Sequence, residues 1–137
     1  MNLLNGTWEG VFWYGKFFHI IDFNFLLQNG NGGTIKGAGV DSLAGNFDIE
    51  GTFSFDSDQS HFNLSFEKKY FRHDIMFERD GKLKDMTKFN CSATIPLSNT
   101  TQMSGKGSFD IEANKWMAEL STWVEEDGLS MTKFPGS

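Results

Sequence analysis

Apolar and polar residues alternate along most of the chain, most regularly between residues 32 and 55. In the second part of this stretch, Phe47, Ile49 and Gly51 would lie on one side of an extended chain, with acidic residues between them on the other. A period of two is typical of a strand that buries one face. The stretch therefore predicts two paired strands, joined by a turn at Asp41-Ser42.

The same alternation recurs on either side of this hairpin and predicts eight strands in all. They span residues 7–14, 17–27, 34–40, 45–55, 60–67, 71–79, part of 82–95, and 105–113. Short strands that follow one another through tight turns favour an all-β fold, an eight-stranded antiparallel up-and-down barrel. We predict a single barrel domain over residues 1–137, with its strands within 7–113. A flattened β-sandwich is the alternative architecture.

The period changes near the C-terminus. Large apolar residues recur at helical spacing from Trp116 to Val124, and they predict a C-terminal helix that ends at Gly128. The alternative is a hairpin, because residues 127–134 repeat the Asp-Gly and Met-Thr-Lys-Phe sequences of residues 80–89, whose second part falls in a predicted strand. The region 114–134 is therefore a helix or a hairpin.

A predicted two-residue turn at Gly15-Lys16 sets the pairing of the first two strands. It would place Trp8 opposite Phe23 and Phe12 opposite His19. All the pairs of this register sort cleanly into two faces, as a correct register should.

A second predicted turn, near Lys69-Tyr70, would place Phe66 opposite His73. Lys68 and Lys69, with Arg72 close by, would then form a hairpin tip. Charges at such a tip are usually solvated, so we interpret this basic cluster as exposed.

The composition narrows the class of protein. The 137 residues include 15 Phe and 4 Trp, enough for a substantial aromatic core in one domain. The net charge of -6 disfavours a nucleic-acid partner. No apolar run is long enough for a membrane span, and the single cysteine, Cys91, reads as a buried thiol. We expect a soluble, cytoplasmic protein.

Gly6-Thr7-Trp8, at the head of the first predicted strand, resembles the G-x-W start shared by the calycins, which are the lipocalins, fatty-acid-binding proteins and avidins. In these families the tryptophan closes one end of the barrel, and the resemblance implies that role for Trp8. Gly10 stands where avidins place a polar ligand residue, so a biotin site is not implied.

The candidate ligand site comes from polar residues on apolar strand faces. His19 and His73 each alternate with large apolar residues, and Tyr14 shares the inward face of the first strand. Buried polar groups need partners, so these side chains could anchor a polar atom of a bound molecule. Phe12 and Phe66, which face the two histidines in the predicted registers, complete the site. The spacing of the histidines along their strands does not suit a shared metal ion, and no cofactor motif is present.

Three functions are compatible with the predicted barrel. The favoured one is non-enzymatic binding of a small, mainly hydrophobic molecule inside the barrel. The second is a solid barrel that acts as a protein-interaction or structural module. The third is an enzyme of cyclase or isomerase type, which would need His19, His73 and Tyr14 to converge. No motif for nucleophilic catalysis is present, so a protein without enzymatic activity is favoured.

An apolar block is predicted on the outer face of the first hairpin. It consists of Val11, Trp13, Phe18 and Ile20. An exposed block of this kind should be covered. We expect either the C-terminal segment or a second copy of the chain, in a homodimer, to cover it.

Overall fold

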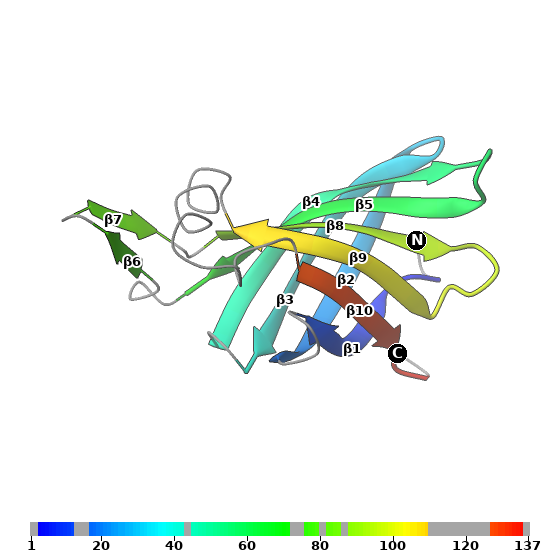
Figure 1. The fold of residues 1–137 in the computed structure, drawn as a ribbon. Coiled ribbons are helices and arrows are strands. Elements are labelled where there is room, and N and C mark those ends of the chain that lie inside the picture. Colours follow the sequence, from blue (N-terminus) through cyan, green and yellow to red (C-terminus); the bar gives the residue numbers. More distant parts are fainter. Residues whose placement is uncertain are drawn as a thin grey trace.

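The computed structural model describes residues 3–12, 17–42, 45–71, 76–79, 82–85, 88–109 and 127–135. These residues form a closed barrel of eight antiparallel strands, as the alternation predicted (Figure 1). The barrel strands are β1 (Gly6–Phe12), β2 (Phe17–Asn29), β3 (Gly32–Asp41), β4 (Gly45–Asp56), β5 (His61–Tyr70), β8 (Lys88–Pro96), β9 (Gln102–Phe109) and β10 (Asp127–Lys133). Each barrel strand pairs with the preceding and the following one, and β10 returns to β1.

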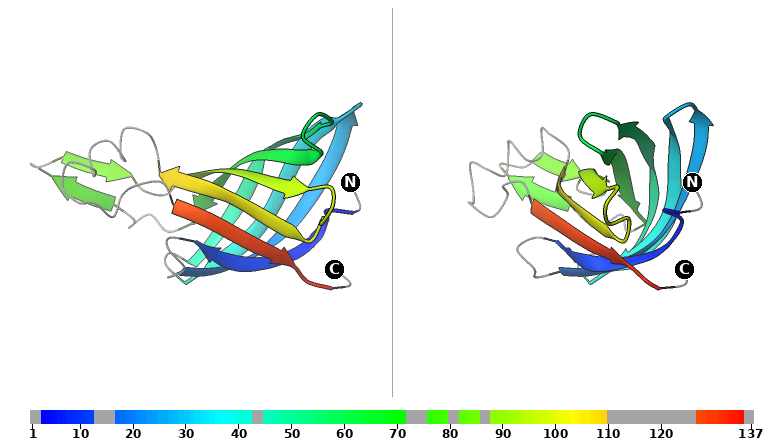
Figure 2. Two further views of the ribbon diagram at one scale, coloured as in Figure 1. Left: turned by 45° about the vertical axis from the view of Figure 1, so that its right-hand side comes forward. Right: turned by 90° about the vertical axis from the view of Figure 1, so that its right-hand side faces the viewer.

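Of the strand predicted at residues 71–79, the described stretch 76–79 is not part of the barrel. β5 pairs instead with β8, so that Phe66 faces Cys91 and Leu64 faces Ala93. β6 (Met76–Arg79) and β7 (Lys82–Asp85) form a separate two-stranded ribbon beyond one end of the barrel (Figures 1 and 2). The physical reason is the inward face of each segment. Phe89, Cys91, Ala93 and Ile95 of β8 are all apolar and buried, whereas the corresponding face of 71–79 includes His73 and Arg79.

The strand predicted at 105–113 is present in the barrel as β9, over Gln102–Phe109, but it is the seventh barrel strand, and the eighth is β10. β10 pairs with β9 on one side and with β1 on the other, and so closes the barrel. A helix that ends at Gly128 is therefore wrong for its last two residues, which already belong to β10. Residues 110–126 lie outside the described residues, so a helix there stays a prediction. Residues 127–133 are extended, and the hairpin that the sequence repeat indicated over 114–134 stays a prediction.

The predicted pairing of β1 with β2 is wrong by two residues. Trp8 faces Ile21 and Val11 faces Phe18, because β1 ends at Phe12 and four residues, 13–16, separate it from β2. A shift of two keeps every side chain on its predicted face, since neighbouring residues of a strand point to opposite sides. The inward and outward assignments therefore remain correct although the pairs changed.

One half of the barrel, which we call the aromatic half, is filled by apolar side chains. It lies at the end where β1 begins, and Trp8 is fully buried there with its indole Nε1 donating to the carbonyl of Leu4 at 3.1 Å. Phe23 and Phe25 lie 5.6 Å apart between ring centroids, and Phe25 meets Phe53 edge to face at 5.3 Å. Each such side chain contributes about 1.5–3 kcal/mol by leaving water. This half is the core of the fold.

In the part of the chain described above, no helix has the length and apolarity that crossing a membrane requires.

Candidate ligand site in the polar half of the barrel

Among the described residues, four polar side chains point into the opposite half of the barrel, which we call the polar half. They are His19 on β2, Asp41 on β3, and Lys68 and Tyr70 on β5, and all are buried. His19 and Asp41 are paired neighbours on adjacent strands, whereas β5 lies two strands further round the wall. The same alternation that places phenylalanines inside the aromatic half thus places a polar cluster inside this half.

Lys68 and His19 are in direct contact across the barrel. The Lys68 Nζ atom lies 3.0 Å from His19 Nδ1, and neither residue has any exposed surface. Burial, together with the charge of Lys68, lowers the pKa of His19 to about 3. The imidazole is therefore neutral at pH 7, and Lys68 donates to Nδ1. This leaves the ring proton on Nε2, which is buried as well.

Two aromatic rings flank the amine of Lys68. Nζ lies 4.9 Å from the ring centre of Phe47 and 5.4 Å from that of Phe89, which suits cation–π attraction. Burial nevertheless lowers the pKa of Lys68, against the opposing influence of Cys91 and Asp41. The Phe89 ring occupies the space of the missing side chain of Gly107, since a Cβ there would lie 2.2 Å from Cε1 of Phe89.

Asp41 and Tyr70 form the second pair of the cluster. The Tyr70 hydroxyl donates to Oδ2 of Asp41 at 2.5 Å, and the Tyr70 ring meets Phe47 edge to face at 5.4 Å. Burial, and then the charge of Asp41, raise the pKa of Tyr70. The phenol therefore keeps its proton and remains a donor at neutral pH.

Cys91, which is paired with Phe66, is buried where the two halves meet, close enough for the charge of Lys68 to act on it. Burial raises the pKa of its thiol to about 11, although the charge of Lys68 acts in the opposite direction. The side chain is therefore a neutral thiol at pH 7, as the sequence indicated.

The predicted site residues fall in different places. His19 lies in the cluster, while Phe66 lies one inward position further along β5 and packs against Phe23 at 5.4 Å, in the aromatic half. The backbone of Phe12 pairs with β2 and β10, and its side chain is outside the described part. Tyr14 and His73 lie outside the described residues, so their convergence with His19 stays a prediction.

The interpretation of Lys68 as a solvated hairpin tip is wrong. β5 continues to Tyr70, so Lys68 points inward while Lys69 is exposed; Arg72 lies outside the described residues. The signal was present in the sequence, because the inward alternation of Phe62, Leu64 and Phe66 continues through Lys68 and Tyr70. Ending the strand at Glu67 hid it, since adjacent lysines resemble a solvated turn.

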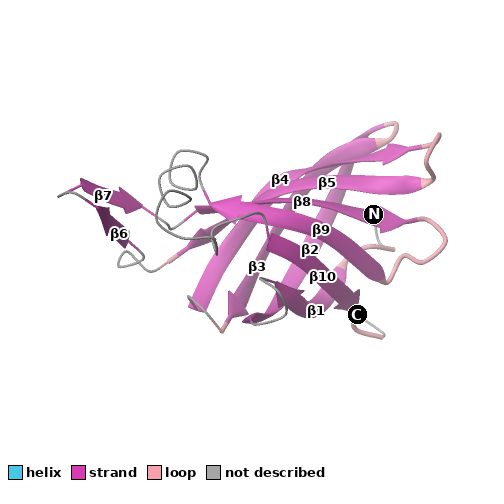
Figure 3. Cartoon of the chain, in the orientation of Figure 1, coloured by secondary structure: helices cyan, strands magenta, loops and turns pink. Residues whose placement is uncertain are grey.

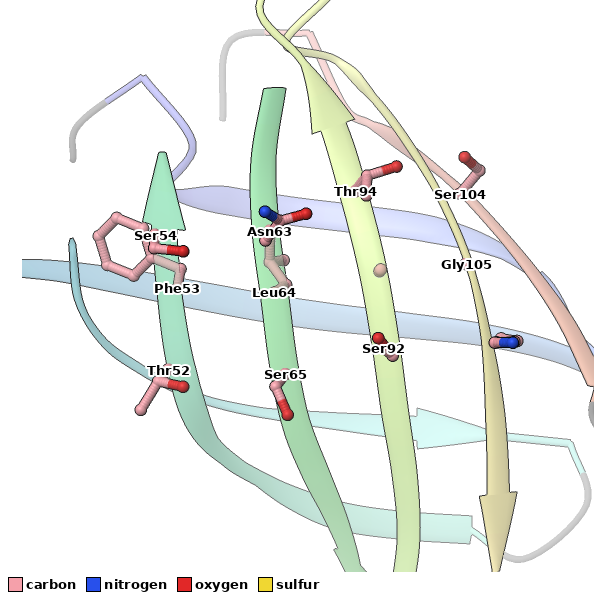
Figure 4. A pocket seen from close by; sticks show the side chains of 12 residues that line it. Thr52, Phe53, Ser54, Asn63, Leu64, Ser65, Ser92, Thr94, Ser104 and Gly105 are labelled. Atoms are coloured by element: carbon pink, nitrogen blue, oxygen red, sulfur yellow. The ribbon is translucent and has the colours of Figure 1, made fainter. Parts of the chain in front are cut away.

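The outer wall carries a different kind of surface. An open concavity is lined by hydroxyl and amide side chains of β4, β5, β8 and β9, among them Thr52, Asn63, Ser65 and Thr94 (Figure 4). These are the outward positions of strands whose inward positions form the core. Among the described residues no group of three or more His, Cys, Asp or Glu side chains could hold a metal ion.

No protein-family model and no curated protein matches the chain. Several solved structures share its fold. A redesigned β-barrel, mFAP1, bound to DFHBI has a TM-score of 0.54 at 13% identity, covering 97% of this chain and 96% of that chain. The structure of EF1p2_mFAP2b bound to DFHBI has a TM-score of 0.58 at 15% identity, covering 97% and 95%. At these identities the likeness shows the fold alone. It agrees with the resemblance to calycin barrels at that level.

The described residues form strands and loops (Figure 3). The polar cluster therefore owes its arrangement to strand pairing. Its members come from residues 19 to 70, and register alone brings them together.

Proposed function

We propose that the protein binds a small, mainly apolar molecule in the polar half of the barrel, without changing it chemically. The observation that carries this proposal is the buried contact of Lys68 with His19, inside walls formed by Phe47 and Phe89. Ligand sites of this kind combine apolar walls with a few polar groups that fix the orientation of the ligand. Burying an amine is costly, so its retention in a core suggests a role other than stability.

The packing of the aromatic half also favours a ligand position in the polar half. Its interior is filled by rings in mutual contact, so a ligand entering the described barrel would have to occupy the polar half. The neighbours mFAP1 and EF1p2_mFAP2b were both determined with DFHBI bound, which makes a small molecule a reasonable occupant of this fold. A cytoplasmic location, which the single buried thiol of Cys91 suits, remains part of the proposal.

Titration with Nile red, a neutral apolar fluorophore, tests the proposal. We expect wild type to bind it with enhanced, blue-shifted emission, and His19→Phe to bind it about 5- to 150-fold more weakly, the equivalent of an unpaired polar group. His73→Leu tests the predicted second histidine in the same way. Lys69→Met is the matched control, because Lys69 is the outward neighbour of Lys68.

Two results would contradict the proposal. Nile red could fail to bind wild type, or His19→Phe could bind it as tightly as wild type and Lys69→Met. In either case the solid barrel acting as a protein-interaction module becomes the better account. Native mass spectrometry of the protein from its own source would, in contrast, identify a ligand that copurifies with it.

A further inference from the structure

Two adjacent lysines on β5 differ in their surroundings. Lys68 has no exposed surface, whereas Lys69 faces outward. A lysine amine is a nucleophile only without its proton, and burial among apolar groups is how proteins obtain a neutral lysine. The chain therefore provides a candidate reactive amine beside an ordinary one, in the same strand.

The charges around Lys68 disfavour an anionic ligand. Asp41 already supplies a carboxylate to the cluster, and its charge acts on Lys68. His19 is neutral at pH 7, so a second carboxylate from a ligand would bring an uncompensated negative charge into a poorly solvated space. A neutral polar group, carried on an apolar molecule, suits the cluster better.

Building on the proposed ligand site, we infer that Lys68 binds small apolar aldehydes covalently, as a reversible imine. The carbonyl group is the neutral polar group that such a ligand presents, and its carbon is the atom that an amine attacks. Phe47 and Phe89, which flank Nζ, would contact the apolar remainder of the molecule. The inference thus specifies the chemical class of ligand for the polar half.

The bond changes balance without any oxidant or reductant. The lone pair of neutral Lys68 Nζ forms a bond to the aldehyde carbon while the carbonyl π electrons move to oxygen. Both protons of the amine then leave with that oxygen as water, and a C=N bond remains. Hydrolysis by water reverses the sequence, so the aldehyde is held and released unchanged.

His19 is a positioning residue in this scheme. Its Nδ1 atom lies 3.0 Å from Nζ and accepts a hydrogen bond from it, which holds the amine between the rings. The buried rings also limit the access of water to the imine, which slows its hydrolysis. His19→Gln, which retains an acceptor, should therefore trap aldehyde at Lys68 faster than His19→Leu.

Reductive trapping tests the inference on the full chain. Cinnamaldehyde and sodium cyanoborohydride at neutral pH should convert an imine to a stable secondary amine, which adds the mass of the aldehyde less one oxygen atom. Peptide mapping should then find Lys68 modified on the order of tenfold faster than Lys69, because a larger fraction of the buried amine lacks a proton. Both lysines are measured in the same molecule, so the comparison needs no variant.

Cinnamyl alcohol separates the inference from the proposed function, because it has the same carbon skeleton and cannot form an imine. Displacement of Nile red by the alcohol, with trapping at equal rates on Lys68 and Lys69, would overturn the imine and leave the ligand site. Failure of both the alcohol and the aldehyde to displace Nile red would overturn both the imine and the proposed ligand site.

The Lys68→Met variant should lose the fast trapping. If that variant does not fold, the triple variant His19→Leu/Asp41→Asn/Lys68→Met takes its place.

Discussion

The two halves of the barrel are built from the same strands, yet their interiors oppose each other in character. β5 shows the contrast within one strand, since Leu64 and Phe66 point into the aromatic half and Lys68 and Tyr70 into the polar half. In the first half every buried side chain gains free energy by leaving water. In the second the buried amine and carboxylate lose hydration, and their hydrogen bonds only partly offset that loss.

The comparison separates the residues that stabilise the fold from the polar residues that the fold holds in its interior. The aromatic half has rings in contact from opposite walls, and such packing is sufficient to hold a barrel of this size together. Ring packing of this kind contributes less to stability in the polar half. The rings of that half nevertheless fit closely against neighbouring glycines. The Phe89 ring needs Gly107, and the Phe47 ring, whose Cζ would lie 2.7 Å from a Cβ on Gly39, needs that glycine.

The sharpest test of the aromatic half is Trp8→Ala. Trp8 is fully buried, so its removal should cost about 3–5 kcal/mol in the free energy of unfolding, measured by urea denaturation. Phe18→Ala is the matched control, because 45% of the Phe18 surface is exposed and its loss should cost far less. An unchanged midpoint for Trp8→Ala would mean that this end of the barrel does not carry the stability.

The polar half should respond in the opposite direction. The triple variant His19→Leu/Asp41→Asn/Lys68→Met replaces the buried imidazole, carboxylate and amine by uncharged side chains of similar size. We expect its free energy of unfolding to equal that of wild type or exceed it by about 1–4 kcal/mol, while Nile red binding and aldehyde trapping are lost. A triple variant that unfolds at clearly lower urea would show that the cluster stabilises the fold, and the contrast between the halves would fail.

Acid should destabilise the protein through His19. The unfolded chain takes up a proton on this residue below its ordinary pKa of 6.5, whereas the folded protein does so only near pH 3. The unfolded state thus binds more protons between these values, and stability falls as the pH falls from 6.5 to 3, by at most about 1.4 kcal/mol per pH unit. His19→Leu should remove this part of the slope in urea denaturation across that range. An identical slope in wild type and variant would contradict the burial of a neutral imidazole.

The smallest expected change in the free energy of unfolding comes from substitutions on the outer wall around the polar half. Val11 and Phe18 are paired and 37% and 45% exposed, and Ile20 pairs with Val40, which is 44% exposed. Trp13 lies outside the described residues. We propose that this apolar patch forms a homodimer, in which Phe18→Thr should weaken association about tenfold in sedimentation experiments while changing the free energy of unfolding by about 0.5 kcal/mol or less.

Leu97→Thr is the control for this last prediction, since Leu97 is 50% exposed at the opposite end of the barrel. Equal association of the two variants, or a wild type that stays monomeric at high concentration, would count against the patch as an interface.

Much of the fold could be predicted because inward and outward positions follow from local alternation. The faces of β1 and β2 were correct even though their register was not, since the error was two residues. The errors arose where several segments compete for the same partner. Both 71–79 and 88–96 alternate over nine residues, and β5 pairs with the second, whose inward positions are all apolar and buried.

The sequence by itself determined that the chain forms an antiparallel barrel with an aromatic core, because a period of two specifies which side chains are buried without reference to any partner. It also indicated that His19 points inward. Only the tertiary structure decided that His19 meets Lys68, because the two lie on strands separated by β3 and β4 and their contact depends on the registers of all the pairings between them. A register is settled by the closure of the whole barrel, and no local pattern contains that information.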